Sequence, residues 1–370
     1  MKRENETALG FPRRSRRLAG AVAVLLLPCA ACVAEHRLGL DDGSGAGSPT
    51  AQPDVWAFDI SGGSSSDQLA VAIGPTTAAE TSIKMVDTHD GAEVRVIKPA
   101  MHGAPNVLVR QANGIVAVGD LSTVSLFKSD GTALRLIPHD VGVSAMALSM
   151  DGAVLVTATA AGYDNVDAAV RRFQVATGAE ILPRIANLTA GGSVAWIGSL
   201  AISPDGATTA AGGGTGVHLW RASDGVQLAA IPTPGVVALS AGELAVGGQD
   251  VVSFYSLAGE RLGQYWTPPY QGLAYSGDGT KLAVLTSGQP YNPGPHPFGV
   301  KIVNRPGGTE AATFVDEWHG PPVPGEKAVG AIGLTFVEND AAVAVGWSDR
   351  RVTLFSASDG RPFWTRVLSP

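Results

Sequence analysis

Cysteine is nearly absent from this sequence. The chain of 370 residues contains two, Cys29 and Cys32, both close to the N-terminus. Residues 33–370 therefore hold no disulfide, no cysteine-ligated metal site and no cysteine nucleophile. Hydrophobic residues make up 45% of the chain, so a large core can form without a covalent cross-link.

Charged residues are scarce and unevenly placed. They make up only 16% of the chain. The segment before Cys32 holds six of the 26 basic residues and two of the 33 acidic ones, so the remainder carries a net charge of −11. Because contacts with phosphates need clustered Lys and Arg, we expect no nucleic acid partner. The simplest role of such a charge is solubility.

Recognisable catalytic motifs are missing as well. There is no G-x-S-x-G turn and no H-E-x-x-H helix, and the seven histidines are scattered. The glycine-rich stretch 212–216 is not followed by Lys-Ser or Lys-Thr, so it is a loop rather than a phosphate-binding loop. We therefore expect no catalytic residues, no metal site and no cofactor.

The first 54 residues have the pattern of an export signal followed by a linker. Residues 1–17 are basic and polar, and residues 19–31 form an apolar run of about 20 Å as a helix, which is short for a membrane span. This order is typical of a secretory signal peptide. We predict a signal peptide over residues 1–31 and a disordered Gly/Ser/Pro-rich tether over residues 32–54.

Cys32 is a candidate for lipid attachment. Ala30-Ala31-Cys32 resembles the end of a bacterial lipobox, although Cys29 stands where that motif usually has Leu. Leu27-Pro28-Cys29 is a weaker alternative, and a plain signal peptide with two incidental cysteines stays open. Ser15-Arg16-Arg17-Leu18 resembles a twin-arginine signal faintly, because the expected apolar pair does not follow. We expect an exported protein, periplasmic or at the cell surface, lipid-anchored to a bacterial envelope membrane.

One unit of four short strands, a to d in chain order, recurs from residue 55 onward. The clearest copy contains LAIS, ATTAAG, VHLWRA and VQLAAI between residues 200 and 231. Ser203-Pro204-Asp205-Gly206 connects a to b, and Ala222-Ser223-Asp224-Gly225 connects c to d, with residue types that favour tight turns. The glycine of the c–d turn recurs seven times, 34 to 53 residues apart, at Gly91, Gly131, Gly178, Gly225, Gly259, Gly307 and Gly360.

These units predict an all-β fold. Their strands are rich in Val, Ala, Leu and Ile, as sheets buried on both faces are, and no stretch after residue 55 has helical periodicity over 11 residues. One such sheet cannot bury both faces, whereas sheets packed face to face in a ring can. We predict a seven-bladed β-propeller of four-stranded antiparallel sheets over residues 55–370, expected to be monomeric. The first and last copies each contain four strands, which leaves open how the ring closes.

The units resemble those of the WD-repeat and YVTN-type propeller superfamily. Residues 139–152, HDVGVSAMALSMDG, match the WD-repeat opening of a His, two apolar positions and a Ser-x-Asp-Gly turn. Asp250 and Asp349 stand at the b–c turn where that family has a structural Asp. The Gly-His pair is missing from the other copies, and no copy ends in Trp-Asp.

Structural roles are expected for the residues that carry this resemblance. Asp250 and Asp349 should accept turn hydrogen bonds, and His139 should pack between blades. His218 and Trp220 lie on a strand that should be buried, so we interpret them as core residues.

Long loops predict a binding surface on one face of the ring. In this architecture the a–b and c–d turns share one face, and the b–c and d–a loops share the other. The long insertions are the b–c loops 160–169 and 287–299 and the d–a connection 315–330. Aromatic and His side chains on such loops suit recognition. The candidate binding residues are Tyr163, Asp164, Asn165, Tyr291, Asn292, His296, Phe298, Trp318 and His319.

The sequence therefore favours a non-enzymatic interaction module that presents this face to a protein, peptide or glycan. The alternative is a propeller enzyme, a lactonase-like hydrolase or a quinoprotein-type oxidoreductase, with a site in the axial channel. Residues 356–364 resemble the Trp-containing docking motif of pyrroloquinoline quinone enzymes, but the motif occurs once, and the a strands LAIS and AMALS are apolar. A scaffold with no ligand beyond its neighbours is a third interpretation.

Overall fold

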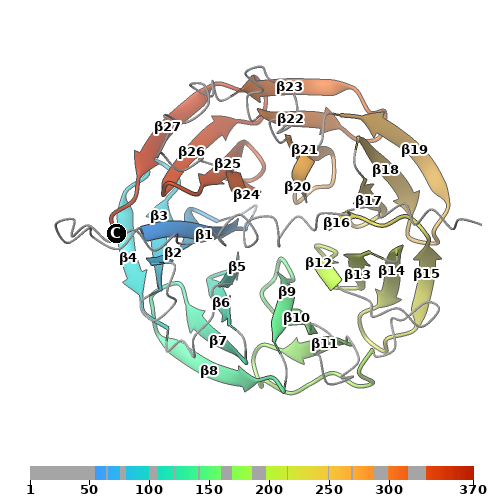
Figure 1. The fold of residues 1–370 in the computed structure, drawn as a ribbon, viewed down its shortest axis with the longest axis horizontal. Coiled ribbons are helices and arrows are strands. Elements are labelled where there is room, and N and C mark those ends of the chain that lie inside the picture. The colour runs from blue at the N-terminus through green and yellow to red at the C-terminus, as the bar shows by residue number, and fades with distance from the viewer. Residues whose placement is uncertain are drawn as a thin grey trace, which may run out of the picture.

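The chain folds into a ring of seven antiparallel β-sheets, the blades of a β-propeller (Figure 1). The computed structural model describes residues 55–63, 66–75, 81–99, 107–120, 122–140, 142–159, 169–185, 197–214, 216–248, 250–267, 270–286, 299–315 and 331–370. These residues include no helix, and hence none able to cross a membrane. The predicted fold class is confirmed. The predicted signal peptide and tether lie outside the described residues.

The a strands of the seven units form the inner wall of the ring, each beside the a strands of its two neighbours (Figure 1). They are β1 (Val55–Gly62), β5 (Leu108–Ala112), β9 (Val143–Leu148), β12 (Ile197–Ile202), β16 (Val236–Leu239), β20 (Tyr270–Tyr275) and β24 (Ala331–Val337).

The b and c strands form the middle of each blade. The b strands are β2 (Gln68–Pro75), β6 (Ile115–Gly119), β10 (Val154–Thr159), β13 (Thr208–Gly213), β17 (Glu243–Gly247), β21 (Lys281–Thr286) and β25 (Ala342–Trp347). The c strands are β3 (Ser82–Asp87), β7 (Thr123–Lys128), β11 (Ala169–Gln174), β14 (Gly216–Arg221), β18 (Val251–Ser256), β22 (Gly299–Asn304) and β26 (Arg351–Ser356).

The d strands form the outer circumference of the ring. They are β4 (Glu93–Ile97), β8 (Ala133–Pro138), β15 (Gln227–Ile231), β19 (Arg261–Trp266), β23 (Glu310–Val315) and β27 (Pro362–Val367).

Burial of consecutive residues explains why the sheets assemble into a ring. Leu69 and Val71 of β2 pack in a cluster with residues of the seventh blade, whereas Ala70 and Ala72 pack in a cluster with residues of the second. Successive side chains of a strand point to opposite faces, so each blade buries one face against each neighbour. Strands of this kind need apolar residues at every position rather than at alternate ones.

The turn chemistry predicted from sequence is present. Ser149 and Asp151 close the a–b turn of the third blade, because Ser149 Oγ donates to Asp151 Oδ1 at 2.6 Å and the N–H of Ala153 donates to the same oxygen at 2.9 Å. The Ser-x-Asp-Gly turns of the fourth and sixth blades repeat this arrangement at Ser203-Asp205 and Ser276-Asp278.

The c–d turn glycines all have positive φ, as a left-handed turn position requires. In six blades the predicted glycine donates its N–H back to the end of strand c, as Gly91 does to the carbonyl of Asp87. In the sixth blade the predicted turn glycine was wrong by one residue. There Gly308, not Gly307, makes this bond, to the carbonyl of Asn304.

The third blade departs from the predicted four strands. Its sheet contains β9, β10 and β11 only, and residues 180–185 pair with β11 through two isolated bridges, Val170 to Ile185 and Phe173 to Glu180. Pro183 lies between the bridges and has no N–H to donate to a ladder. Its carbonyl instead accepts a hydrogen bond from the Arg172 guanidinium.

The ring closes by packing the last blade against the first, with no exchange of strands between them. Thr335 Oγ1 on β24 donates to the carbonyl of Gly62 on β1 at 2.9 Å. Trp364 of β27 is buried in the cluster that these two blades share, and its Nε1 donates to the carbonyl of Thr88 at 2.7 Å. The Trp of the quinone-like motif is therefore part of the ring closure.

Residues at the C-terminus extend this contact. Ser369 Oγ lies 2.7 Å from both Lys84 Nζ and Glu93 Oε2, and its N–H donates to Glu93. Lys84 and Glu93 belong to the first blade and form an ion pair of 3.3 Å with each other.

Candidate functional site

The predicted binding residues lie in segments that the structure does not describe. This holds for the b–c loops of the third and sixth blades, for the d–a connection before the seventh, and for the lipid candidate Cys32. The residues concerned are Tyr163, Asp164, Asn165, Tyr291, Asn292, His296, Phe298, Trp318 and His319.

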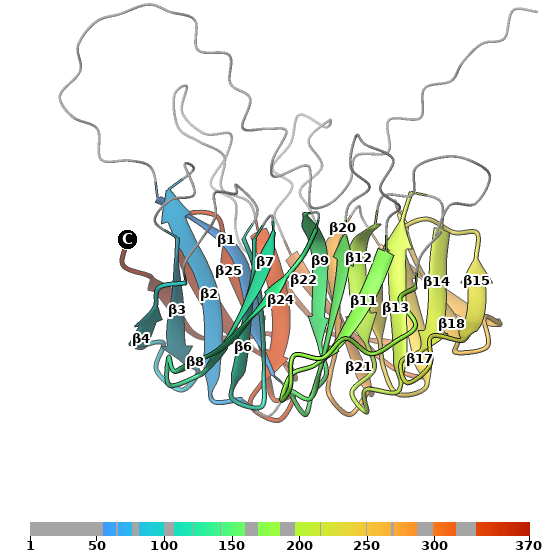
Figure 2. The same cartoon turned by 90° about the horizontal axis from the view of Figure 1, so that it is seen from below.

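The strand ends that flank these segments can be located. Thr159 pairs with Ala169, and Thr286 pairs with Gly299, which in turn pairs with Val315. All five residues therefore lie at the same end of the blades, opposite the a–b and c–d turns (Figure 2). A terminal Thr holds each b–c connection: Thr159 Oγ1 lies 3.2 Å from the N of Ala169, and Thr286 Oγ1 donates to the carbonyl of Gly299 at 3.0 Å.

The opposite face consists of short turns that bond across blades. Asp340, in the a–b turn of the seventh blade, accepts the N–H groups of Gly277 and Asp278 of the sixth at 2.8 and 3.1 Å. Asn113 of the second blade donates to the carbonyl of Asp151 in the third at 2.9 Å. Their polar groups are engaged within the ring.

The structural role predicted for the aspartates at the b–c turns is confirmed for Asp349, which accepts from Arg351 N at 3.1 Å and from Arg351 Nε at 2.7 Å. For Asp250 the prediction stays open, because the bond described there is a main-chain one, from the N–H of Thr267 at the end of strand d to the Asp250 carbonyl. Sequence reasoning did not single out Asp120, which accepts three bonds from Ser122 and Thr123. The signal was its place directly after the b strand IVAVG.

His139 packs between the second and third blades, as predicted. Its Nε2 lies 2.9 Å from Thr157 Oγ1, and its ring meets Phe173 edge-on at 5.6 Å. Burial and, to a smaller extent, the charge of the nearby Arg171 lower the pKa of His139 to about 4, so the ring is neutral at pH 7.

His218 and Trp220 stack on the face of β14 that meets the third blade, with ring centroids 5.7 Å apart. Trp220 is a core residue, as predicted. His218 is only half-buried, which corrects its prediction as a core residue. Its burial lowers its pKa.

The inner wall carries one cation and one anion among the seven described a strands, and these pair with each other. Arg110 Nη1 of β5 lies 2.7 Å from Asp59 Oδ2 of β1, and Arg110 Nε donates to the carbonyl of Met146 on β9. Within the described part of the chain, no three His, Cys, Asp or Glu side chains are grouped so that they could hold a metal ion.

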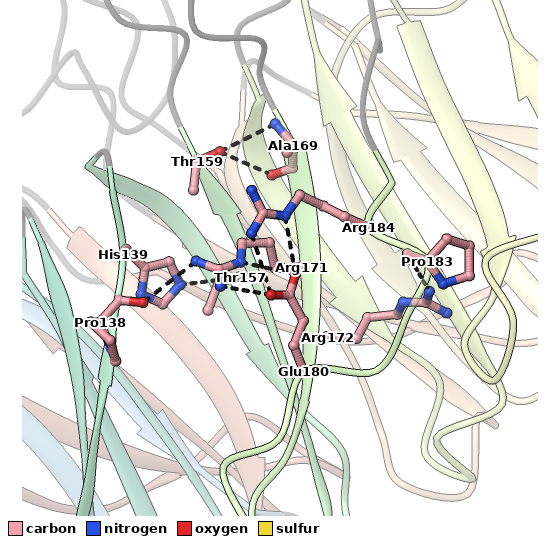
Figure 3. A network of polar contacts seen from close by, with 10 residues as sticks. All are labelled: Pro138, His139, Thr157, Thr159, Ala169, Arg171, Arg172, Glu180, Pro183 and Arg184. Atoms are coloured by element: carbon pink, nitrogen blue, oxygen red, sulfur yellow. Dashed lines mark hydrogen bonds and ion pairs between the residues drawn. The ribbon is translucent and has the colours of Figure 1, made fainter.

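A network of polar contacts lies on the outer edge of the third blade (Figure 3). Arg171 Nε and Nη2 donate to Glu180 Oε1 and Oε2 at 3.0 and 2.7 Å, and Arg184 donates to the same two oxygens at 3.1 and 3.4 Å. Arg171 also lies over the Phe173 ring, 4.9 Å from its centre. The two guanidinium groups, Arg171 foremost, lower the pKa of Glu180 to about 2.

Arg172 points the other way from the same strand and is fully buried. Its Nη2 donates to the carbonyl of Pro183 at 2.5 Å, and its Nη1 donates to the carbonyls of Ala222 and Arg221 in the fourth blade. Sequence reasoning missed this network. The available signal was two adjacent arginines in a strand predicted to be buried.

No protein-family model matches this chain, and no curated protein matches its sequence.

Proposed function

We propose that this chain is a non-enzymatic, envelope-associated β-propeller that binds a protein, peptide or glycan through its b–c and d–a loops. The proposal includes membership of the WD-repeat and YVTN-type superfamily, which rests on the residues quoted above. The propeller architecture itself is compatible with interaction modules in general.

The difference between the two ends of the blades carries this proposal. One end consists of short turns whose polar groups bond within the turn, as at Asp151, or to a neighbouring blade, as at Asp340 and Asn113. At the other end, the strand pairs Thr159–Ala169 and Thr286–Gly299 flank two of the longest insertions in the chain. Binding residues concentrate on loops held by a rigid scaffold.

Loop replacement tests the proposal. Full-length chain in detergent is cross-linked to envelope extract, beside variants in which residues 161–167, 288–297 or 317–329 are replaced by short Gly-Ser linkers. We expect at least one replacement to abolish capture of a defined partner while the sheet spectrum in circular dichroism is unchanged. A matched control is Asn113→Ala, on the opposite face, which should capture normally. Identical capture by all three loop variants and the wild type would contradict the proposal.

We also propose that the chain is exported and anchored through lipid on Cys32, which supports the envelope location. Mass spectrometry of the mature N-terminus tests this directly. The expected result is cleavage before Cys32 and a lipid mass on that residue, lost in Cys32→Ser and retained in Cys29→Ser. An unmodified mature N-terminus would refute the anchor.

A further inference from the structure

The outer edge of the third blade has an unusual balance of charge. Glu180 is shared by Arg171 and Arg184, so one carboxylate faces two cations. Glu310, on the described part of the sixth blade's outer strand, contacts a single cation instead, Lys301 at 3.0 Å. One positive charge of the Arg171–Glu180–Arg184 cluster is therefore not neutralised by direct contact.

Two more arginines lie close to this cluster, Arg172 on the side of the fourth blade and Arg135 on the side of the second. The buried Arg172 contacts carbonyl oxygens and no carboxylate. Arg135 of β8 reaches the c–d turn of the third blade, where it donates to the carbonyls of Thr177 and Ala176, each at 2.6 Å. Carbonyls satisfy the N–H groups of a guanidinium and leave its charge in place.

The net charge of the side chains in this region is positive, although the chain as a whole is acidic. Three arginines, Arg135, Arg171 and Arg184, lie here against Glu180 and the exposed Asp140, whereas the whole chain has a net charge of −7. Arg172 faces the fourth blade, where Asp224 acts on it, and is not counted here. The seam between the second and third blades therefore attracts anionic partners that most of the surface repels.

The same edge presents an exposed apolar side chain. Leu182 is 70% exposed, and the side chain of Arg184 is 44% exposed. In the described part of the chain, no strand lies outside residues 180–185, which pair with β11 on their inner side only.

We propose that the outer edge of the third blade binds an extended acidic peptide segment of a partner protein. A carboxylate of the peptide pairs with Arg184, and a neighbouring apolar side chain packs on Leu182. Planar guanidinium groups bind carboxylates through two parallel hydrogen bonds, which favours Asp and Glu over other residues. This surface lies on the outer edge of the blade and includes none of the loops 160–169, 287–299 and 315–330.

Fluorescence anisotropy with the full-length chain tests this inference. The probe is a fluorescein-labelled octapeptide of alternating Glu and Val, and the reference is the same peptide with Lys in place of Glu. We expect the acidic peptide to bind about 10-fold more tightly or better, with an affinity that falls as salt rises. Equal affinity for the two peptides, or no detectable binding of either, would overturn the proposal.

Matched variants locate the site. Arg184→Glu should weaken binding about 10-fold or more, the loss expected for a charge-assisted contact. Arg221→Glu is the control, because Arg221 is an exposed arginine of the fourth blade that pairs with Asp224 alone. It should bind as the wild type does; equal weakening in both variants would refute a local site.

A second variant distinguishes loss of the site from loss of the fold. Leu182→Ser touches no ion pair and should weaken binding measurably at an unchanged melting temperature. Unaltered affinity in Leu182→Ser would refute the apolar contact. Because the loop replacements leave this edge intact, peptide binding that survives them separates this inference from the proposed function.

Discussion

Trp364 provides the most direct test of how the ring closes. Its ring packs with Ile60 and Val86 of the first blade, only 8% of it is exposed, and its Nε1 donates to the carbonyl of the buried Thr88. Truncating a buried Trp to Ala costs about 3–5 kcal/mol through lost packing and the cavity left behind. Leaving the buried carbonyl of Thr88 without its hydrogen-bond donor costs about 1–3 kcal/mol more. We therefore expect Trp364→Ala to lower the free energy of unfolding by about 4 kcal/mol or more.

Urea unfolding of the full-length chain, followed by circular dichroism, measures this change. Trp364→Phe keeps most of the ring and removes the donor, so it should lose only about 1–3 kcal/mol. The matched control is Trp266→Ala on β19, also a d strand, where the side chain is 68% exposed and the expected change is within about 0.5 kcal/mol. A loss of less than about 1 kcal/mol in Trp364→Ala, or equal losses in both alanine variants, would refute closure through this contact.

Three further predictions concern the third blade. Its arginines depress the pKa of Glu180 from 4.5 to about 2, so the ion pairs stabilise the fold above pH 4.5 and this contribution is lost as the pH falls towards 2; Glu180→Gln should remove that part of the acid dependence of the urea midpoint. Burial depresses the pKa of His139 from 6.5 to about 4, so His139 takes up a proton in the unfolded chain but not in the folded one between these pH values, and the fold loses stability as the pH falls from 6.5 to 4. His139→Asn should therefore reduce the pH dependence of the urea midpoint in that window. An unchanged pH dependence would contradict this. Arg172→Ala should lower the free energy of unfolding, measured in urea, by about 2–4 kcal/mol, because it leaves a cavity and removes the donor to the carbonyls of Pro183 and Ala222. An unchanged free energy of unfolding would show that removing the buried charge offsets both losses.

The turns show how far sequence reasoning extends. Ser149 and Asp151 bond within one turn, so three or four residues contain all the chemistry that forms it. The sixth blade was misplaced by one residue because Gly307 and Gly308 both suit a left-handed position, and only the pairing of the flanking strands selects Gly308. The missing fourth strand of the third blade had a local signal in Pro183, but its consequence depended on Arg172, eleven positions away.

The sequence by itself determined the number of blades, the order of their strands and the end of each blade at which the connections lie. These features follow from turn residues and apolar runs that act over a few neighbouring positions. Only the tertiary structure decided which distant groups meet. Trp364 and Thr88 are separated by 276 positions and Arg110 and Asp59 by 51, and they are brought together by the curvature of the ring. The sharing of Glu180 by Arg171 and Arg184 likewise required the outer segment to fold back on β11, since residue spacing alone does not specify that contact.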